Sequence, residues 1–579
     1  MIPHVIHPLL RKDVIEARAY QLEGVAETLE ASTLLIYPTA AGKTVVSAMV
    51  VAEKIHQESG FAVLLAPTVG LVDQHYKTFK NWFSEDIRVN TLTGSQPAKR
   101  RKGVWQSSDL VVATPQVFRN DVQNGLLDPS DLSMLVLDEA HHSVGNHAMG
   151  QSADLYVDCS DSRILAMTAS PGYSKRHVQD LCKRLAINRI HMRSSSDSSV
   201  KKYLSELDIL EIRVDVPVDL KKLAHPFNEW QESLVDVERR LGRYVHEGRI
   251  GYAGLSGAMD RAKGAIRRGD GSAYASVSRL ALAMTLNHLI NHLLSQGVGA
   301  AREFLSRKAM GESRTKKSGR DFLKDHRVST LMSQLDGLTE IHSKIGTVRR
   351  LVVERLRRNP KSKIIIFATF RDTVSSIHKA IENIDDVKAL KFVGQAKKNG
   401  VGLTSSQQIE TIDLFRKGDA NVLVATSVGE EGLDIPSADL VVFYEPVGSE
   451  IRTIQRRGRT GRRRQGDVIV LIAEGTRDEG AANSSQRREE AMLRSIHSVR
   501  RSLLVGPIDY SVLDSFSVSS EQGLIDASSF IQEERERYKH KFSISDTSNE
   551  GASPRIPESA GGLDAKTFRP WGQSGLDDF

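Results

Sequence analysis

Uninterrupted apolar runs alternate with helix-periodic segments in two separate stretches of this chain. In the first stretch, from about residue 31 to 190, the runs cover residues 33–37, 61–66, 109–114 and 134–140. In the second stretch, from about residue 361, they cover residues 363–368, 421–426, 439–444 and 467–473. An uninterrupted apolar run followed by a helical segment is typical of a strand buried on both faces of a parallel sheet. We therefore predict an α/β protein with two parallel-sheet domains in tandem.

The region between about residues 214 and 341 has a different pattern, in which helical periodicity dominates. We interpret it as an all-helical domain inserted between the two sheets, with a basic loop at residues 311–320 (GESRTKKSGR). Its recurring basic residues either contact nucleic acid, which we favour, or form only a solvated helix surface. They include Arg239, Arg240, Arg243, Arg249, Arg261, Lys263, Arg267 and Arg268.

The periodicity weakens after about Leu504, and from Ser545 the chain is polar and rich in Ser, Gly, Pro and Glu, which predicts disorder. These changes divide the chain into five expected parts. They are a first sheet domain (1–205), the helical insertion (206–340), a second sheet domain (341–510), a helical extension (511–545) and a disordered tail (546–579).

Composition and charge restrict the class of protein only partly. The 579 residues carry a formal net charge of +7, which is compatible with a polyanionic partner but does not require one. The two cysteines, Cys159 and Cys182, belong to no paired-cysteine motif, which argues against a zinc ribbon and a disulfide framework. No run approaches the roughly 18 apolar residues of a membrane span, and no signal peptide is recognisable. We expect a cytoplasmic protein.

The first candidate for chemistry is PTAAGKT (38–44), which joins the apolar run 33–37 to a helical segment. A strand, a tight loop and a helix beginning at Gly-Lys-Thr are typical of a phosphate-binding loop, whose backbone N–H groups face the phosphates. Lys43 would bind the β- and γ-phosphates and Thr44 would bind Mg²⁺. Tyr37 departs from the general pattern, which has glycine there. The expected nucleotide-binding residues of this loop are Pro38, Thr39, Ala40, Ala41, Gly42, Lys43 and Thr44.

The second candidate is LVLDEAHH (135–142), an apolar run that ends in adjacent acids. Such acids lie at the carboxyl edge of a parallel sheet, beside the phosphate-binding loop. Asp138 is predicted to hold Mg²⁺, and Glu139 to orient and deprotonate the attacking water. The alternative is a pair of acids that only caps a helix. We do not expect a metal site at His141 and His142, because adjacent histidines point in different directions.

The third candidate is QRRGRTGR (455–462) in the second stretch, which places Arg459 and Arg462 three residues apart. So many guanidinium groups would be costly in a core, but they suit a phosphate. We expect both to stabilise the transferred γ-phosphoryl group, reaching it from a separate domain so that domain closure controls hydrolysis. The alternative is a basic surface turn.

With TAS (168–170), these strings resemble motifs I, II, III and VI of the superfamily 2 helicases. Ala40 stands where helicases usually carry glycine. The resemblance implies two RecA-like domains, ATP and Mg²⁺ as cofactors, and ATP-driven movement along nucleic acid. It assigns adenine contact to Gln21, ATP ribose contact to Gly432 and Asp434, the nucleic-acid track to Thr68, Thr114, Thr369 and Thr426, and coupling between the domains to His141 and Gln455.

A narrower resemblance is to the archaeal Hef helicase and its relatives, the Fanconi anaemia group M translocases. It is carried by LDEAHHSVGNHAMG (137–150), VATSVGEEGLDIP (424–436), VVFYEPV (441–447) and GTRDE (475–479). It implies a DNA helicase or translocase that acts on forked or branched DNA in fork repair and recombination. Because the acidic-basic motif of the XPF-type nuclease is not found after the motor, we expect no nuclease activity. The alternatives are an RNA helicase or double-stranded RNA translocase, and a clamp-tethered DNA scaffold without catalysis.

The last seven residues, QSGLDDF (573–579), resemble the peptide that docks on the sliding clamp PCNA. Gln573, Leu576 and Phe579 have the required spacing, and one turn of 3₁₀ helix would place Leu576 and Phe579 on one face. A disordered tether ahead of such a peptide would help its capture. PCNA is therefore a second expected partner beside DNA.

Overall fold

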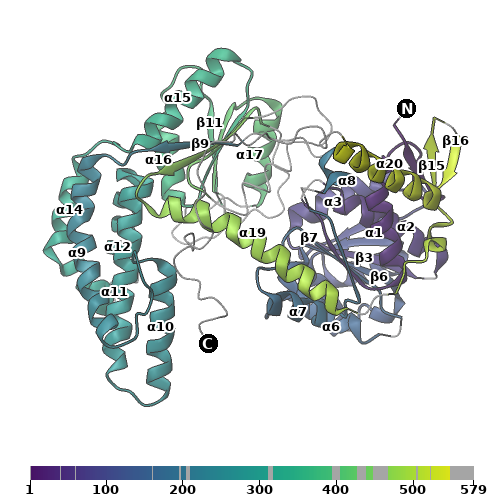
Figure 1. The fold of residues 1–579 in the computed structure, drawn as a ribbon, viewed down its shortest axis with the longest axis horizontal. Helices are drawn as coiled ribbons and strands as arrows, with labels where there is room; N and C mark the ends of the chain where they lie inside the picture. Colours follow the sequence, from purple (N-terminus) through teal and green to yellow (C-terminus); the bar gives the residue numbers. More distant parts are fainter. Residues whose placement is uncertain are drawn as a thin grey trace, which may run out of the picture.

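Two α/β lobes and a helical domain make up the computed structural model of this chain (Figure 1). Within the residues it describes, no helix is both long and apolar enough to cross a membrane. The described residues are 2–38, 41–58, 60–159, 161–194, 197–203, 209–310, 317–393, 405–426, 438–446, 467–503, 506–521 and 523–547.

The first lobe is built on a seven-stranded sheet with the order β4-β5-β3-β6-β7-β2-β8, in which all neighbours run parallel. Alternate strand residues face opposite layers, so Leu35 and Leu64 pack with α1–α3, whereas Ile36 and Leu65 pack with α4–α7. Both faces are therefore covered, as the apolar runs predict. The strands are β2 Thr33–Ile36, β3 Phe61–Leu65, β4 Val89–Leu92, β5 Leu110–Ala113, β6 Leu132–Asp138, β7 Ile164–Thr168 and β8 Arg189–Met192. The helices are α1 Ala19–Glu30, α2 Lys43–Gln57, α3 Val69–Trp82, α4 Ala98–Ser107, α5 Pro115–Gln123, α6 Ala148–Val157, α7 Lys175–Arg184 and α8 Ser198–Lys201.

The second lobe has a parallel sheet with the order β11-β12-β10-β13-β14-β9. Strand β9 (Ile209–Val214) corrects the expected start of the insertion at residue 206, because it pairs with β14 and belongs to this sheet. Helices α15 and α16 cover one face and α17 the other. The elements are β10 Ile364–Ala368, β11 Ala389–Phe392, β12 Val422–Thr426, β13 Leu440–Phe443, β14 Asp467–Ala473, α15 Ser343–Arg358, α16 Arg371–Ile381 and α17 Ser405–Lys417.

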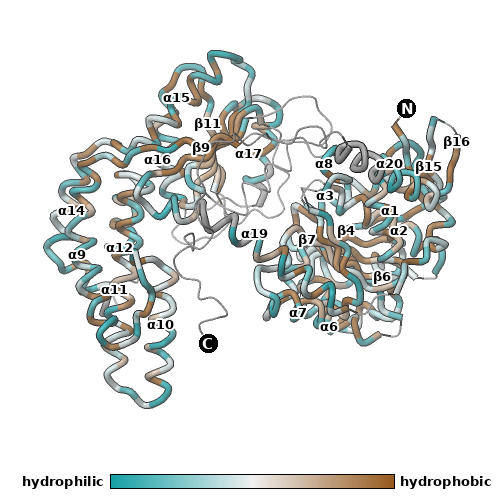
Figure 2. Tube along the Cα trace, in the orientation of Figure 1, coloured by the Kyte–Doolittle hydropathy of each residue, from teal (hydrophilic) through white to brown (hydrophobic). Residues whose placement is uncertain are grey.

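The insertion is helical, as predicted, and it extends away from the second sheet (Figures 1 and 2). One apolar cluster joins its helices to Val214 and Ala473 of the second lobe, and another holds α9, α10 and α11 together. The expected loop 311–320 is helical at its end, since α13 begins at Lys317; residues 311–316 lie outside the described residues. The elements are α9 Val218–Arg240, α10 Tyr252–Arg267, α11 Ala273–Asn291, the π-helical turn η3 His292–Gln296, α12 Val298–Met310, α13 Lys317–Lys324 and α14 His326–Asp336.

After the second sheet the chain returns to the first lobe. Helix α19 (Arg477–Ser502) starts beside β14 and ends on the first lobe, where Met492, Ile496 and Val499 join the apolar cluster of α4–α7. The segment beyond it corrects the expectation of a simple helical extension. Strands β15 (Ser517–Ser520) and β16 (Gly523–Asp526) form a three-stranded sheet with β1 (His4–Ile6), and α20 (Ala527–Thr547) packs on α1. The tail from residue 548 lies outside the described residues.

Candidate functional site: a phosphate-binding loop and its acidic partner

The phosphate-binding loop lies where β2 gives way to α2. Gly42 is the N-cap of α2 and has a φ of +89°, in the left-handed region that favours glycine. A Cβ atom on it would lie 2.1 Å from Nε2 of Gln21, so a side chain there would displace the Gln21 amide. Lys43 and Thr44 open the helix, and the Lys43 ammonium donates to the carbonyl of Tyr37 at 3.3 Å. The N-terminus of a helix with free N–H groups is a suitable site for phosphate.

Gln21, the predicted adenine contact, lies against this loop. Its side-chain amide donates to the Ala41 carbonyl at 3.0 Å, and the Tyr20 hydroxyl donates to the same oxygen at 2.9 Å. The Tyr37 hydroxyl in turn donates to the Tyr20 carbonyl at 2.6 Å. Tyr37, which departs from the usual glycine, therefore ties the end of β2 to the helix that carries Gln21. Pro38 lies at the end of β2, whereas Thr39 and Ala40 fall outside the described residues.

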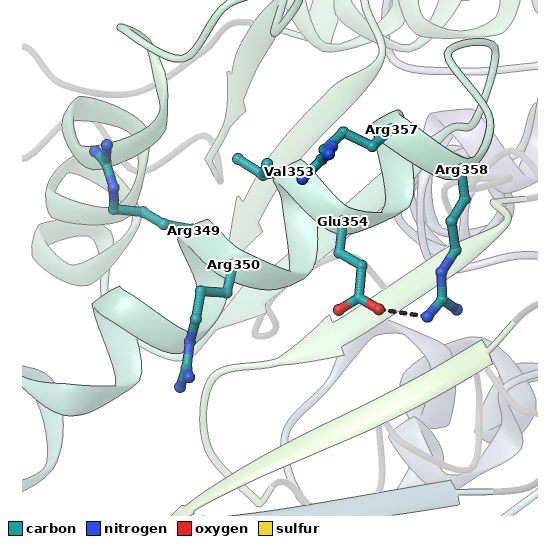
Figure 3. A pocket seen from close by; sticks show the side chains of 6 residues that line it. All are labelled: Arg349, Arg350, Val353, Glu354, Arg357 and Arg358. Carbon is teal, nitrogen blue, oxygen red and sulfur yellow. Dashed lines mark hydrogen bonds and ion pairs between the residues drawn. The ribbon is translucent and has the colours of Figure 1, made fainter.

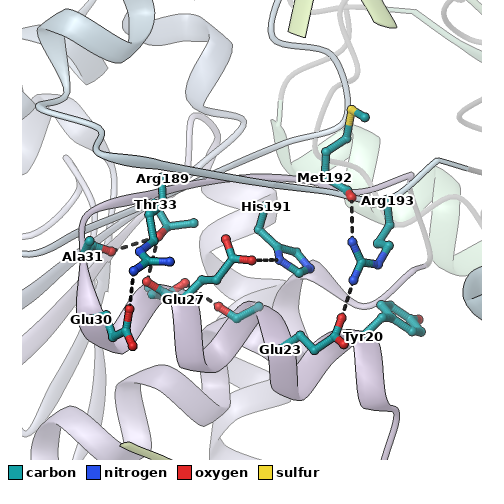
Figure 4. A network of polar contacts seen from close by, with 12 residues as sticks. Tyr20, Glu23, Glu27, Glu30, Ala31, Thr33, Arg189, His191, Met192 and Arg193 are labelled. Atoms are coloured by element: carbon teal, nitrogen blue, oxygen red, sulfur yellow. Dashed lines mark hydrogen bonds and ion pairs between the residues drawn. The ribbon is translucent and has the colours of Figure 1, made fainter. Parts of the chain in front are cut away.

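Three acidic residues on one face of α1 hold that helix against β8 (Figure 4). Glu27 lies 2.9 Å from the His191 ring, between ion pairs of Glu23 with Arg193 and of Glu30 with Arg189. The spacing follows from geometry, because the acids are one helical turn apart and their partners are alternate strand residues. Burial alone would raise the pKa of Glu27, but its hydrogen bond to His191 and the nearby positive charges lower it overall. These three contacts, which we call the α1 ladder, thus fix the position of Gln21 against the phosphate-binding loop.

Asp138 ends β6 on the same edge of the sheet and is buried. Its carboxylate lies 2.8 Å from Nε2 of His75, a residue of α3. Burial would raise the pKa of Asp138, but the hydrogen bond and charge of His75, together with the charge of Lys43, lower it below the usual range. The carboxylate therefore stays charged and close to the phosphate-binding loop. The Asp138 carboxylate and the Thr44 hydroxyl are hard oxygen donors of the kind that Mg²⁺ prefers, so the residues present fit the expected ion.

Glu139 has a left-handed backbone conformation, with φ +52°, which is unusual for a residue other than glycine. Such strain is often found at functional sites. Nδ1 of His141 lies 3.5 Å from the Glu139 carboxylate and 3.1 Å from the Thr168 hydroxyl. Because Thr168 ends β7 in the same lobe, these contacts connect the second motif with the TAS segment. The role in coupling the two domains that is expected of His141 stays a prediction.

The four threonines of the expected nucleic-acid track lie at the carboxyl ends of strands. Thr68 follows β3 and caps α3, where its hydroxyl accepts from the amide of Leu71 at 3.3 Å; Thr114 caps α5 after the adjacent strand β5. In the second lobe Thr369 follows β10 and Thr426 ends the adjacent β12. The Thr426 hydroxyl is buried and has no hydrogen-bond partner among the described residues. Each lobe thus brings its pair of threonines to one edge of its sheet.

Helix α15 carries a concentration of arginines in the described part of the second lobe (Figure 3). They line an open hollow of about 740 Å³ together with Val353 and Glu354, and Arg358 is paired with Glu354. The carboxyl end of α15 leads into the start of β10, which is the sheet edge opposite Thr369. Arg357 and Arg358, at that end of the helix, therefore lie away from the sheet edge that Thr369 follows. The arginines of the hollow are Arg349, Arg350, Arg357 and Arg358.

Several predicted site residues lie outside the described residues, so their positions remain predictions. They are Arg459, Arg462 and Gln455 in the arginine-rich motif, Gly432 and Asp434 of the expected ribose contact, and Gln573, Leu576 and Phe579 of the clamp peptide.

Sequence reasoning missed His75. The buried residues of α3 are Leu71, Val72, His75 and Phe79, which follow the spacing of a helix face toward the core. A histidine within an apolar stripe was a usable signal. Its partner could not be predicted, because Asp138 lies 63 positions further along the chain.

Two family models match the chain: the DEAD/DEAH box helicase model over residues 18–178 and the helicase conserved C-terminal domain model over residues 343–464. Among solved structures, the chain is similar to the Pyrococcus furiosus Hef helicase domain, with 34% sequence identity and a TM-score of 0.62. That match covers 82% of this chain and 100% of the solved one.

Curated relatives agree with this match. A protein of Methanocaldococcus jannaschii named as an ATP-dependent RNA helicase is 34% identical over 85% of this chain and 62% of its own length. The ATP-dependent DNA helicase mph1 of Neurospora crassa is 30% identical over 83% of this chain and 43% of its length. The Fanconi anemia group M protein homolog of Mus musculus is 30% identical over 84% of this chain and 26% of its length. The chain thus spans less than two thirds of the length of each of these relatives. Because it matches the whole of the solved Hef helicase domain, the chain belongs to the superfamily 2 helicases of the Hef and Fanconi anaemia group M type.

Proposed function

We propose that this protein is an ATP-hydrolysing DNA helicase or translocase that acts on forked or branched DNA. The observation that carries the proposal is the buried Asp138 carboxylate, which His75 holds in its charged form beside the phosphate-binding loop of Lys43. A charged carboxylate and a phosphate-binding loop at the same edge of a sheet suit a nucleoside triphosphate with its Mg²⁺ ion.

Each residue of the site has a role in this chemistry. ATP supplies the phosphoanhydride bond that is broken. Lys43 neutralises phosphate charge, Thr44 and Asp138 supply oxygen ligands for Mg²⁺, and Glu139 accepts a proton from the attacking water. Arg459 and Arg462 of the second lobe complete the site when the two lobes close. Closure shifts the contacts that Thr68 and Thr114 make with the DNA strand relative to those of Thr369 and Thr426.

Two substitutions test this assignment. Lys43→Ala should lower ATP turnover by about a hundredfold or more, the size expected when a group that stabilises transition-state charge is removed, while DNA binding is retained. Arg459→Ala should lower turnover similarly while ATP still binds, because the arginine acts only in the closed state. Turnover retained by Lys43→Ala would refute the phosphate-binding assignment, and turnover retained by Arg459→Ala would refute the finger assignment.

Exposed cations of the insertion support a nucleic-acid partner. Lys263 and Arg267 of α10 and Arg268, which follows it, lie exposed, whereas Arg243 is buried with an ion pair to Asp270 at 2.7 Å. The exposed residues are available to phosphates, and Arg243 holds the insertion together. Charge reversal at Lys263 and Arg267 should therefore weaken DNA binding in a salt-dependent way. Arg243→Ala should mainly lower the stability of the insertion.

The substrate is the part of the proposal that needs a direct comparison. The name of the Neurospora crassa relative favours DNA, and the name of the Methanocaldococcus jannaschii relative favours an RNA helicase as the second candidate. ATPase stimulation and strand remodelling should be measured on forked DNA, a Holliday junction, linear duplex DNA and duplex RNA. Stronger stimulation by the branched DNAs supports the proposal, and stronger stimulation by duplex RNA would replace it.

We also propose that residues 573–579 bind the sliding clamp PCNA. The support is the spacing of Gln573, Leu576 and Phe579. Phe579→Ala should abolish retention of the protein on immobilised clamp, whereas Asp577→Ala, which lies between the two apolar anchors, should leave it largely intact. Equal retention of Phe579→Ala and the unchanged protein would exclude the peptide.

A further inference from the structure

One junction between the insertion and the second lobe lies at the end of helix α11. Helix α11 closes in the π-helical turn η3, whose last three carbonyl groups each accept a hydrogen bond from a side chain of the second lobe. His342 contacts the Leu294 carbonyl at 2.9 Å, Lys344 donates to Ser295 at 3.2 Å, and Tyr444 donates to Gln296 at 3.0 Å. All three donors are almost completely buried. Carbonyls at a helix end need partners from outside the helix, and here the second lobe supplies them.

The donors are themselves held in place. Burial and the charge of Lys344 lower the pKa of His342 to about 4, so its ring is neutral. The Lys344 amide donates to Nδ1 of this ring, which leaves the proton on Nε2 for the Leu294 carbonyl. The Lys344 ammonium is paired with Asp478 at the start of α19. The start of α15 and the residue after β13 therefore meet at η3, and α19 is connected to them through Lys344.

Gln296 makes the connection that reaches furthest. Its side chain is 2% exposed and uses both ends of its amide. Nε2 donates to the Glu445 carboxylate at 2.8 Å, and Oε1 accepts from the Thr373 hydroxyl of α16 at 2.8 Å. Orientation of the amide is fixed by this pairing, because the carboxylate only accepts and the hydroxyl has donated its proton.

Glu445 passes this contact to the nucleic-acid track. It follows β13 and is 5% exposed, and the oxygen that Gln296 leaves free accepts a hydrogen bond from the backbone amide of Thr369. A buried carboxylate is costly unless hydrogen bonds satisfy it, so the position of Glu445 depends on both donors. One residue of the insertion thereby fixes the loop after β10.

We propose that Gln296 is a positioning residue through which the helical insertion sets the nucleic-acid grip of Thr369, by holding Glu445 against the backbone amide of that threonine. The proposal rests on the proposed function, in which Thr369 contacts the DNA strand. Movement of the insertion on a branched substrate would displace Gln296, release Glu445 and loosen the loop of Thr369. The insertion therefore regulates the second lobe's hold on the track as well as offering cations to DNA.

A purely structural role for Gln296 is the competing explanation, and Thr373→Val separates the two. This variant removes the hydrogen bond between Thr373 and Gln296 but keeps the one between Gln296 and Glu445. Gln296→Leu removes both and leaves Glu445 without its second donor. A structural role predicts similar losses in both variants, whereas a positioning role predicts a specific loss in Gln296→Leu.

The test uses the full chain and measures ATPase activity against the concentration of a forked DNA and of a single-stranded oligonucleotide, with thermal midpoints recorded in parallel. For Gln296→Leu, the half-saturating DNA concentration should rise about tenfold on both DNAs, the size expected for one lost hydrogen bond to a charged group. Thr373→Val should stay within about twofold. Gln296→Met, which lacks the amide but keeps an unbranched side chain of similar length, serves the same comparison if Gln296→Leu does not fold.

The outcomes separate the two proposals. An unchanged protein whose ATPase does not respond to DNA would refute the proposed function. A protein that responds to DNA but whose half-saturating concentration is the same in Gln296→Leu, or rises equally in Thr373→Val, would overturn the positioning role alone.

Discussion

His75 and Asp138 form a pair at the residue scale that controls the charge at the centre of the site. The pKa of Asp138 lies below its ordinary value because the hydrogen bond and charge of His75 and the charge of Lys43 outweigh the effect of burial. A lowered folded-state pKa stabilises the protein above the unfolded-state value, and this contribution is lost as the pH falls through the folded-state pKa. The active, charged carboxylate should therefore persist into acid.

Replacing the histidine tests this pair. In His75→Phe the pKa of Asp138 should rise, so the acid limb of the kcat/KM profile for ATP should move to higher pH. The free energy of unfolding should fall by about 1.5–3 kcal/mol, the range for a lost hydrogen bond to a buried charged group. Tyr76→Phe, on the same helix, is the matched control. An acid limb that does not move in His75→Phe would mean that His75 does not control the charge of Asp138.

At this scale the sequence indicates the candidate residues of the ATP site but not the residues that support them. Lys43 and Asp138 occur in short strings whose chemistry requires neighbouring residues. His75 and the Glu27–His191 contact join residues that are distant in sequence. Such partners depend on how helices and strands pack, which local pattern does not specify.

At the scale of elements, the contact between α12 and α16 depends on pH. Burial, together with the hydrogen bond to and the charge of Asp372, raises the pKa of Glu303 to about 7. A raised folded-state pKa gives stability that is present below the unfolded-state value and is lost as the pH rises through about 7. Arg307 is paired with the same Asp372, so the cluster joins the insertion to the second lobe.

We expect the thermal midpoint of unfolding to fall as the pH rises through about 7. In Glu303→Gln this fall should be reduced, because the amide donates to Asp372 at every pH. Glu354→Gln, which removes an exposed carboxyl on α15, should keep the slope of the unchanged protein. Equal slopes in all three proteins would assign the pH dependence to other groups.

The elements that the sequence did not predict are short or lie at an edge. Strand β9 (ILEIRV) is the edge of its sheet and mostly exposed, so Glu211 and Arg213 interrupt the apolar run that marks the buried strands. Strands β15 and β16 have four residues each and include many polar ones. The pairing of β15 with β1 joins the two ends of the described chain, and no local pattern could predict it.

At the scale of the whole molecule, the segment after α19 belongs to the first lobe. Phe516, Phe530 and Ile531 are buried in the apolar cluster of α1–α3, and Arg535 donates to Glu23 of the α1 ladder at 2.6 Å. Burying one such apolar side chain contributes about 1.5–3 kcal/mol. The helix that carries Gln21 therefore depends on residues from the other end of the chain.

Two truncations should separate this role from that of the tail. Removal of residues 506–579 should lower the thermal midpoint of the first lobe sharply and reduce the soluble yield. Removal of residues 548–579 alone should leave the midpoint and the ATPase rate unchanged while abolishing clamp binding. A shared midpoint for both truncations would show that the hairpin and α20 do not stabilise the lobe.

Helix α19 is 26 residues long, or about 39 Å at 1.5 Å per residue, and it is the second crossing between the lobes, after the one that joins β8 to β9. The chain therefore passes from the first lobe to the second and back again, and β1 and β15 pair on the first lobe. A single proteolytic cut in the first crossing would leave two fragments that still elute together, because the first lobe contains α19, β15, β16 and α20 from the second fragment. A further cut within α19 would separate the two lobes, because α19 is then the remaining covalent connection between them.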